Sequence, residues 1–429
     1  MKVADCTASQ VRSILGPYEG GISADAVKAS EITGKYGNPF SAVVKDVLGK
    51  ENTVVIVNLA ADDAQASIND YLVENHSDKI NASLEALVEA VNARDIFILT
   101  TPEISFECKG FKANIVVADR CLVYREESAL YHRIETGELR SCPQEKDFLS
   151  EGYQNRPTVT VDAETLCKLY ATTRPDYADS KLIVVKEGGT KLLAEFKVGT
   201  QISAILEELG CKTEKNPLLG GVLGEFLSKD LLSEAVEYTA KWDLLVLFGA
   251  KDCLADVTLK LAEAADAESC GKCVLCREGT WHILSILKDV TAGKAKKADL
   301  DMILDIGPLI HAGAFCSFGQ NMANAFVSSV EKNREELEAH FIKKKCPAGV
   351  CKAFAKMVID PVKCTGCTDC LDECPEDAIE GKKKFIHLID PDMCDNCGKC
   401  AEVCEEGAIV PQDGTIRVPK KLVRVGKFK

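Results

Sequence analysis

The sequence predicts a chain of four parts. These are an α/β domain over residues 1–150, a small β-grasp-like domain over 151–240, a helical domain over 241–343 and a cysteine-rich domain over 344–429. Two observations indicate this division. Apolar residues follow strand and helix periods in turn through the first half of the chain. Cysteines gather at fixed spacings in the second half.

The first part alternates the patterns of buried strands and helices. Residues 52–60 and 95–100 are apolar runs typical of buried strands, and residues 111–118 indicate another strand. Between the first two runs, residues 79–93 repeat apolar side chains at helical spacing. This order is typical of helices stacked on a parallel sheet.

The second part is expected to form a compact β-grasp-like unit. Residues 181–186 and 191–196 predict two short strands joined by a turn at Gly188-Gly189. A short helix is expected over residues 202–209, and it ends at Gly210, a common C-cap residue.

From about residue 250 the pattern is helical. Helices are expected over residues 254–268, 281–292, 298–311 and 321–342. Short loops between four helices favour a four-helix bundle.

The fourth part contains two copies of the pattern C-x2-C-x2-C-x3-C. Three cysteines at this spacing bind one corner of a [4Fe-4S] cubane, and the fourth cysteine of each run binds the other cluster. One cluster is therefore expected on Cys364, Cys367, Cys370 and Cys404, and the other on Cys374, Cys394, Cys397 and Cys400. A zinc module is the alternative, but structural zinc sites usually pair cysteines two and two. The stretch resembles bacterial two-cluster ferredoxins, although Glu405 departs from their usual proline.

A third [4Fe-4S] cluster is predicted in the helical part, which makes it an iron–sulfur domain. Cys270, Cys273 and Cys276 repeat the cubane spacing, and Cys316, on a loop between two helices, is the expected fourth ligand. Backbone N–H groups of the loop and the charge of Arg277 would raise the cluster's potential. The alternative is zinc bound by four cysteines.

These motifs resemble a known family. Residues 268–280, ESCGKCVLCREGT, with the Cys316 loop, are similar to the NADH-binding flavoprotein subunit of respiratory complex I. They are also similar to the β subunits of NAD-linked and electron-bifurcating [FeFe] hydrogenases and of formate dehydrogenases. Residues 125–130 resemble the family's GEETAL segment, and residues 157–158 and 164–166 resemble its PTV and ETL landmarks. The resemblance implies an SLBB-type β-grasp domain and a cluster that takes electrons from FMN, which takes hydride from NAD(P)H.

The flavin-binding segments depart from the family's pattern. The family's loop GRGGAGFPTGxKW, whose glycines let the backbone approach phosphates, corresponds to residues 34–45. Three of its glycines are replaced by Tyr36, Pro39 and Val43. The family's acidic NADEGEPG turn corresponds to residues 58–65, and its glycine before the paired glutamates is Arg125. We therefore expect a degenerate FMN/NADH site that holds no flavin.

A further metal site is expected near the end of the last helix. Cys346 and Cys351 flank a Pro-Gly turn, His340 lies upstream, and His387 lies between the two cluster runs. These four residues would suit tetrahedral zinc. The alternative is a turn with two free thiols. Cys253 is grouped with the scattered cysteines, which are expected to be small buried or free thiols.

Charge and hydropathy narrow the class of protein. The net charge of −14 argues against nucleic acid as the main partner. No apolar run is long enough to span a membrane. The N-terminal sequence has no signal-peptide core, and the cysteine spacings favour metal ligation in a reducing compartment. We expect a cytoplasmic protein of anaerobic redox metabolism.

Three functions remain open. The first is an electron-transfer subunit with three [4Fe-4S] clusters, no flavin and no catalytic residues. Its partners would be other subunits of a redox complex (a hydrogenase, a formate dehydrogenase or a flavin subunit) or ferredoxin. The second is an enzyme, an FMN-containing NAD(P)H oxidoreductase subunit. The third is a scaffold whose clusters mainly hold the fold together. The altered flavin segments favour the first.

Overall fold

The structure is a computed structural model, and its chain forms two compact units. Described are residues 4–7, 14–34, 39–142, 151–175, 177–229, 232, 243–354, 357–391, 393–394, 397–412 and 415–428. One unit holds Met1–Ala250, Val257–Ile286 and Lys297–Arg334, and the other holds Lys251–Asp256, Leu287–Lys296 and Glu335–Lys429. Among the described residues, none of the helices has both the length and the apolar character needed to cross a bilayer.

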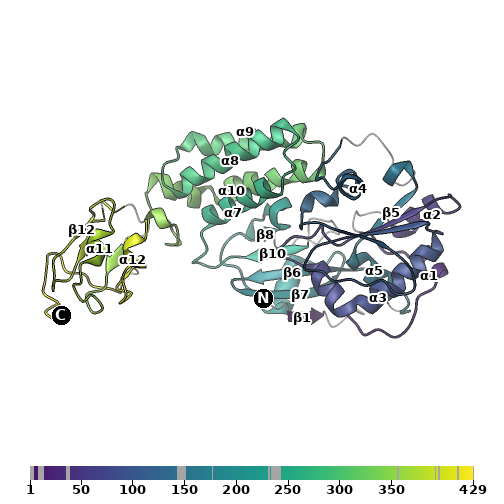
Figure 1. The fold of residues 1–429 in the computed structure, drawn as a ribbon, viewed down its shortest axis with the longest axis horizontal. Coiled ribbons are helices and arrows are strands. Elements are labelled where there is room, and N and C mark those ends of the chain that lie inside the picture. The colour runs from purple at the N-terminus through teal and green to yellow at the C-terminus, as the bar shows by residue number, and fades with distance from the viewer. Residues whose placement is uncertain are drawn as a thin grey trace. The chain divides into compact units, whose positions relative to one another are not determined.

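A four-stranded parallel sheet forms one layer of the first unit (Figure 1). Its strand order is β4 (Asn114–Val117), β3 (Asp95–Thr100), β2 (Val54–Asn58) and β5 (Thr158–Val161). Every residue of β2 is buried, as in a strand that is covered on both faces. The three strands predicted in this region are confirmed, and β5 is an addition.

Helices cover this sheet. They are α1 (Ala24–Lys28), α2 (Phe40–Val47), α3 (Ile68–Ala90), α4 (Glu127–Thr136) and α5 (Ala163–Ala171). Helix α3 packs against α5 and α1. The helix predicted over residues 79–93 is the second half of α3, which extends further toward its N-terminus and has non-helical backbone angles at His76.

A six-stranded mixed sheet forms the second layer of this unit. Its order is β1 (Ala4–Thr7), β7 (Thr190–Lys197), β6 (Ser180–Glu187), β10 (Leu244–Leu247), β8 (Leu218–Leu219) and β9 (Glu225–Phe226). The predicted hairpin of β6 and β7 is confirmed, and so is helix α6 (Ile202–Leu209), which packs Ile202 and Ile205 on the sheet. The sheet also takes in β1 and β10, which lie outside residues 151–240.

The four predicted helices of the next part are confirmed. They are α7 (Leu254–Glu268), α8 (Val274–Thr291), α9 (Lys297–Gly313) and α10 (Ser317–Ile342). Helix α8 begins earlier than expected because Val274 and Leu275 are exposed and interrupt the apolar period. Glycines allow close packing here, since a Cβ at Gly279 would overlap Ile310 and one at Gly307 would overlap Val327.

The cysteine-rich part of the second unit is an internal repeat. Helices α11 (Asp369–Asp372) and α12 (Lys399–Glu402) occupy equivalent positions, and each follows a left-handed residue. Strand β11 (Met357–Ile359) pairs with β14 (Ile409–Pro411), and β12 (Ile379–Glu380) pairs with β13 (Leu388–Ile389). The 3₁₀ turns of the described chain are η1 (Leu122–Arg125), η2 (Tyr153–Asn155), η3 (Gly221–Leu223) and η5 (Lys352–Phe354).

Candidate iron–sulfur and metal sites

The first cysteine run and one distant cysteine surround the same cavity. Cys364, Cys367, Cys370 and Cys404 line a cavity of about 60 Å³. Burial, together with the nearby thiols of Cys367, Cys364, Cys400 and Cys404, raises the pKa of Cys370 to about 12. Thiolates this close together repel one another unless positive iron lies between them. These residues therefore fit a [4Fe-4S] cluster.

The second run lies near the fourth cysteine of the first run. Burial raises the pKa of Cys400, and the nearby thiols of Cys394, Cys374 and Cys397 add to the increase. The structure therefore brings together each set of four cysteines that the spacing predicts for one cluster, with one member of each set taken from the other run.

Backbone donors support both sets in the same way. The N–H of Ala378 donates to Sγ of Cys374 at 3.3 Å, and the N–H of Ala408 donates to Sγ of Cys404 at 3.3 Å. The two pairs are equivalent positions of the repeat. A donor directed at a ligand sulfur stabilises the more negative, reduced form of a cluster.

His387 lies against a cluster cysteine, which corrects the prediction that it joins Cys346 and Cys351. Its Nδ1 atom is 3.3 Å from Sγ of Cys370, and the side chain is buried and lines the same cavity. A cysteine that binds iron carries no proton, so in that state the imidazole must be the donor.

The cysteines of the helical part also converge. Cys270 and Cys273 lie in the segment between α7 and α8, Cys276 lies in the first turn of α8, and Cys316 directly precedes α10. A Cβ placed on Gly319 would lie 3.4 Å from Sγ of Cys276 and 3.8 Å from Sγ of Cys316, so both sulfurs lie over one glycine. Burial raises the pKa of Cys276, a hydrogen bond with Ser269 lowers it and the thiols of the other three cysteines raise it, so that the pKa lies at about 11.

Two acidic side chains hold the loops of this site. Oε1 of Glu126 accepts a hydrogen bond from the N–H of Ser317 at 2.6 Å, next to Cys316. Oε2 of Glu268 accepts one from the N–H of Leu122 at 2.8 Å. Burial raises the pKa of Glu268 to about 7. Neither residue was assigned this role from the sequence, although Glu126 belongs to the segment that resembles GEETAL.

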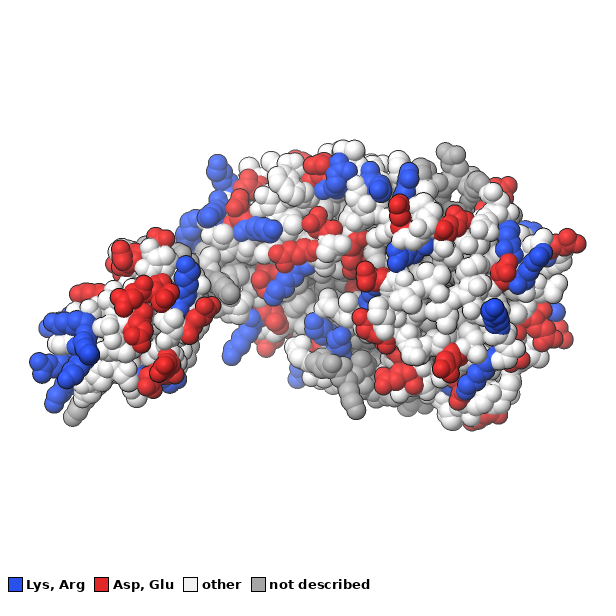
Figure 2. All heavy atoms as spheres, in the orientation of Figure 1, with Lys and Arg blue, Asp and Glu red and all other residues white. Residues whose placement is uncertain are grey.

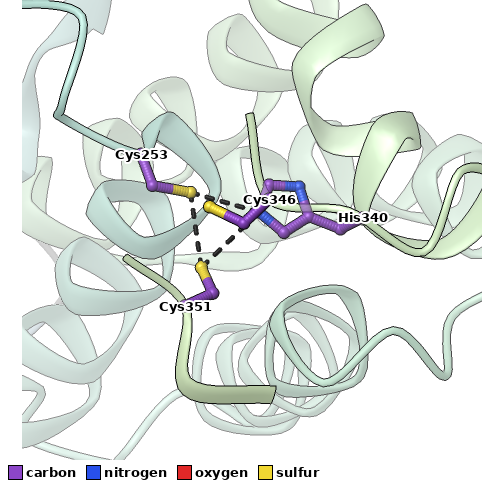
Figure 3. A group of neighbouring side chains, drawn as sticks. All are labelled: Cys253, His340, Cys346 and Cys351. Carbon is purple, nitrogen blue, oxygen red and sulfur yellow. Dashed lines mark hydrogen bonds between the residues drawn. The ribbon is translucent and has the colours of Figure 1, made fainter. Parts of the chain in front are cut away.

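A separate buried group consists of Cys253, His340, Cys346 and Cys351 (Figure 3). Their ligand atoms all lie within 4.8 Å of one another, and the four side chains point toward a common centre. Nε2 of His340 is 3.2 Å from Sγ of Cys253 and 3.5 Å from Sγ of Cys351, and these two sulfurs are 3.5 Å apart. Tetrahedral zinc, with Zn–S of about 2.3 Å and Zn–N of about 2.0 Å, would separate sulfurs by about 3.8 Å and sulfur from nitrogen by about 3.5 Å. The group fits zinc.

The histidine of this group is oriented for metal binding. Nδ1 of His340 lies 2.9 Å from the carbonyl oxygen of Glu336, so it donates there and leaves the lone pair of Nε2 facing the sulfurs. Burial lowers the pKa of His340, but hydrogen bonds with Cys253 and Cys346 outweigh that effect and raise it to about 10. Without a metal Nε2 therefore carries a proton, and zinc binding would displace it to use the lone pair. A positive φ at Gly349 turns the chain between Cys346 and Cys351.

Cys253 takes the place that was predicted for His387. It lies immediately before α7, far from the Cys346–Cys351 turn in sequence, so no local spacing connects it with that turn. Three of the four predicted ligands are brought together, and the fourth is corrected. The one available signal was a cysteine at the start of a predicted helix, which is weak by itself.

Arg125 fills the place where the resemblance expects a glycine. Its Nη2 is 2.6 Å from Oδ2 of Asp243, and its Nε donates to the carbonyl of Ala61 at 3.3 Å. Ala61 belongs to the segment that replaces the family's acidic turn, so the two altered segments contact each other. Asp243 also pairs with Lys181 at 2.5 Å, and Lys181 pairs with Glu164 at 3.1 Å.

The residues at this place do not fit a nucleotide cradle. Arg125, Asp243, Lys181 and Glu164 are all buried, and they satisfy one another rather than a phosphate. In the loop that corresponds to the family's glycine-rich segment, residues 35–38, with Tyr36, lie outside the described residues. Pro39 directly precedes α2, and Val43 lies within it.

Comparison with known proteins confirms the resemblance. Residues 256–340 match the family described as the NADH-ubiquinone oxidoreductase-F iron-sulfur binding region, and residues 356–413 match the 4Fe-4S dicluster domain. The chain is 31% identical to NADP-reducing hydrogenase subunit HndC of Solidesulfovibrio fructosivorans, over 61% of this chain and 59% of that protein. It is 37% identical to an NADH-quinone oxidoreductase subunit of Streptomyces coelicolor, over 26% of this chain and 25% of that protein.

A solved structure shares the fold. The H2-reduced NAD+-reducing [NiFe]-hydrogenase superposes with a TM-score of 0.65 at 19% identity, over 74% of this chain and 62% of that chain. The match to HndC covers about three fifths of that protein, and the match to the Streptomyces coelicolor protein covers about a quarter of it. The chain thus combines a mixed α/β fold with an iron–sulfur binding region and a C-terminal 4Fe-4S ferredoxin domain.

Proposed function

We propose that this chain is an electron-transfer subunit of a cytoplasmic oxidoreductase complex of the hydrogenase or formate dehydrogenase type, with three [4Fe-4S] clusters and no flavin. One contrast supports the proposal most directly. Twelve cysteines converge in three sets of four, whereas the place of the family's glycine before the paired glutamates holds the buried Arg125–Asp243 ion pair.

The chain's own residues would bind and adjust the clusters. Bound clusters supply one-electron transfer. Hydrogen-bond donors directed at the sulfurs of proposed ligands come from the backbone of Ala378 and Ala408 and from the side chain of His387. The loops around the cysteines of the helical part are held by hydrogen bonds to Glu126 and Glu268. Cys253, His340, Cys346 and Cys351 would hold a structural zinc that fixes the end of α10 to the residue preceding α7.

Cofactor content tests this proposal. Protein purified without oxygen should contain about twelve iron and twelve sulfide per chain, as three cubanes require. It should also contain about one zinc and no stoichiometric FMN. Spectra of the reduced protein should resolve three clusters. Full iron together with one tightly bound FMN per chain would contradict the flavin-free part of the proposal.

An FMN-containing NAD(P)H oxidoreductase subunit is the second candidate. It is favoured by the retained Glu126-Glu127 pair and by relatives whose names state NADP reduction or NADH oxidation. Dye reduction by NADH or NADPH, measured with and without added FMN, separates the two candidates. The proposed electron-transfer subunit shows no such activity by itself, and the flavin enzyme does.

A further inference from the structure

Positive charge gathers at one end of the cysteine-rich unit. Figure 2 shows Lys and Arg side chains clustered there, beside a surface of the same unit that carries Asp and Glu. We define the basic patch by five exposed residues on two segments: Lys382, Lys383, Lys384, Arg424 and Lys427. The whole chain carries a net charge of −14, so this patch opposes the overall sign.

The two segments are held together by their backbones. The N–H of Ile386 donates to the carbonyl of Val423 at 2.8 Å, and the N–H of Val425 donates to the carbonyl of Lys384 at 3.1 Å. The ring of Phe385 lies between the segments, with Nζ of Lys382 at 4.4 Å and the guanidinium of Arg424 at 5.8 Å from its centre. The cations of Lys382 and Arg424 therefore lie over one aromatic ring, and the backbone pairing holds the two basic segments next to each other.

These charges are not neutralised locally. Within the described part of the chain, none of the five side chains forms an ion pair. From residue 415 onward the given sequence contains Arg417, Lys420, Lys421 and Lys429 in addition, and no Asp or Glu. A patch of this kind attracts negatively charged partners over roughly one Debye length, about 10 Å at 0.1 M salt.

The basic patch lies directly against a cluster-binding loop. The N–H of Lys384 donates to the carbonyl of Gly366 at 3.0 Å. Gly366 stands between Cys364 and Cys367 with φ of +72°, and a Cβ there would lie 2.8 Å from both the nitrogen and the oxygen of Phe385. Only glycine permits this approach. The backbone that carries the patch thus touches the loop that presents two cysteines of one proposed cluster.

We propose that the basic patch is the docking surface for an acidic protein that carries one electron at a time. This inference rests on the proposed function and names the place where its external carrier binds. Complementary charge would orient the carrier over the Cys364–Cys367 loop. The transfer forms and breaks no bond and moves no proton, since the donor loses one electron and the acceptor gains it. An anionic membrane or a nucleic acid is disfavoured because neither would use the contact with this loop.

Binding measurements on the full chain test the docking surface. The probes are an acidic bacterial two-cluster ferredoxin and a basic cytochrome c, each in its oxidised form. We expect the ferredoxin to bind in low salt and to weaken about tenfold or more between roughly 0.05 and 0.5 M salt, and the cytochrome not to bind at the patch.

Matched charge reversals locate the surface. The triple variant K383E/K384E/K427E should weaken ferredoxin binding about tenfold or more in low salt. The control K288E/K294E/K297E changes the net charge by the same amount. Its exposed lysines lie on α8, between α8 and α9, and on α9, and the variant should bind ferredoxin within about twofold of the wild type. Acetylation of Lys383, Lys384 and Lys427 should slow when ferredoxin is bound, whereas acetylation of Lys288 and Lys294 should not.

Several outcomes would overturn the docking surface. These are no ferredoxin binding in low salt, equal weakening by both triple variants, or unchanged acetylation of the patch. The wild type could instead bind phosphatidylserine vesicles or duplex DNA, and the patch variant could lose that binding while it keeps ferredoxin binding. That result would assign the patch to a membrane or a nucleic acid and overturn the proposal. Iron content and cluster spectra of each variant keep this test separate from the proposed function. If the patch variant contains its clusters and still binds ferredoxin normally, only the docking surface is refuted. If the wild type contains no clusters, the proposed function itself is refuted.

Discussion

The imidazole of His387 lies with Nδ1 at 3.3 Å from Sγ of Cys370, inside the cavity lined by the cysteines of one proposed cluster. A ligand sulfur becomes more negative when its cluster is reduced, so a donor at this position stabilises the reduced form. His387 is buried, and bulk water cannot readily replace that hydrogen bond. We therefore infer that His387 raises the potential of one cluster above that of its partner in the repeat.

Replacing His387 tests this inference. His387→Leu removes the donor and should lower the midpoint potential of one cluster by about 40 mV, which corresponds to about 1 kcal/mol of hydrogen-bond energy for one electron. His387→Asn keeps an N–H donor close to the same position and should restore most of the shift. The potentials are measured by redox titration followed by electron paramagnetic resonance. Three unchanged potentials in His387→Leu would show that the contact has no electronic role.

Metal analysis of cysteine variants tests the group around Cys253. Cys253→Ser should lose one zinc per chain with the iron content unchanged, because its Sγ lies within 3.5 Å of both Cys351 and His340. The folded state should also lose several kcal/mol of stability, since a bound structural zinc contributes its binding energy to folding. Elemental analysis and thermal unfolding provide the measurements.

Two controls accompany that variant. Cys211→Ser changes a buried thiol of the six-stranded sheet's core and should keep all metals. His387→Leu should also keep zinc, because the structure places His387 at the cluster cavity instead. If His387→Leu loses zinc and Cys253→Ser retains it, the ligand set derived from the structure is wrong.

Asp63 predicts a pH dependence of stability. Burial raises the pKa of its carboxyl, and nearby Asp243 adds to the increase, against lowering by the N–H of Gln65 and by Arg125. A carboxyl with a raised pKa in the folded state binds its proton more tightly there than in the unfolded chain. The protonated carboxyl therefore adds to the free energy of unfolding. This contribution is fully present at pH values below the ordinary pKa near 3.8, and it is lost as the pH rises through the pKa of the folded state.

Asp63→Asn removes this titration and keeps the acceptor that bonds to Gln65 at 2.7 Å. The variant should be at least as stable as the wild type at pH 8, and the difference should shrink as the pH falls toward 4. Denaturant unfolding at several pH values measures it. Glu103→Gln is the control: its carboxyl is exposed and its pKa is lowered, so the variant should not show this pattern. A difference that grows on acidification would contradict the assignment to Asp63.

The grouping of the cysteines could be predicted from the sequence because most of the information is local. Cys364, Cys367 and Cys370 lie close together in the sequence, and only Cys404 comes from a distant segment. The repeat supplies it by symmetry. In the group of Cys253, His340, Cys346 and Cys351, by contrast, Cys253 reaches the other ligands only through the tertiary fold. The same limit explains why His387, near the cluster cysteines in sequence, was assigned to the wrong metal.

The two sheets also combine features that the local sequence predicts with features that depend on the tertiary fold. Strand β2 is a continuous apolar run and could be predicted by itself. Strand β5 is the short segment TVTV, whose β-branched residues suit a strand, but its place beside β2 in the sheet follows only from the tertiary fold. Arg125 was noted in the sequence as a lost glycine, but its partner Asp243 is distant in the chain and became visible only in the fold.

Substitution of Arg125 tests whether the buried ion pair supports the fold at the place of the family's glycine before the paired glutamates. Arg125→Met removes the partner at 2.6 Å from Asp243 and should cost about 3–5 kcal/mol, because a buried carboxylate loses one of its two cations. Arg156→Met is the matched control, since Arg156 pairs with Asp95 at the same 2.6 Å but with both side chains partly exposed, and it should cost less than about 1 kcal/mol. Denaturant unfolding of both variants, with iron content checked, gives the comparison. Equal costs in free energy of unfolding would mean that burial adds nothing at Arg125, and the structural role of the ion pair would be refuted.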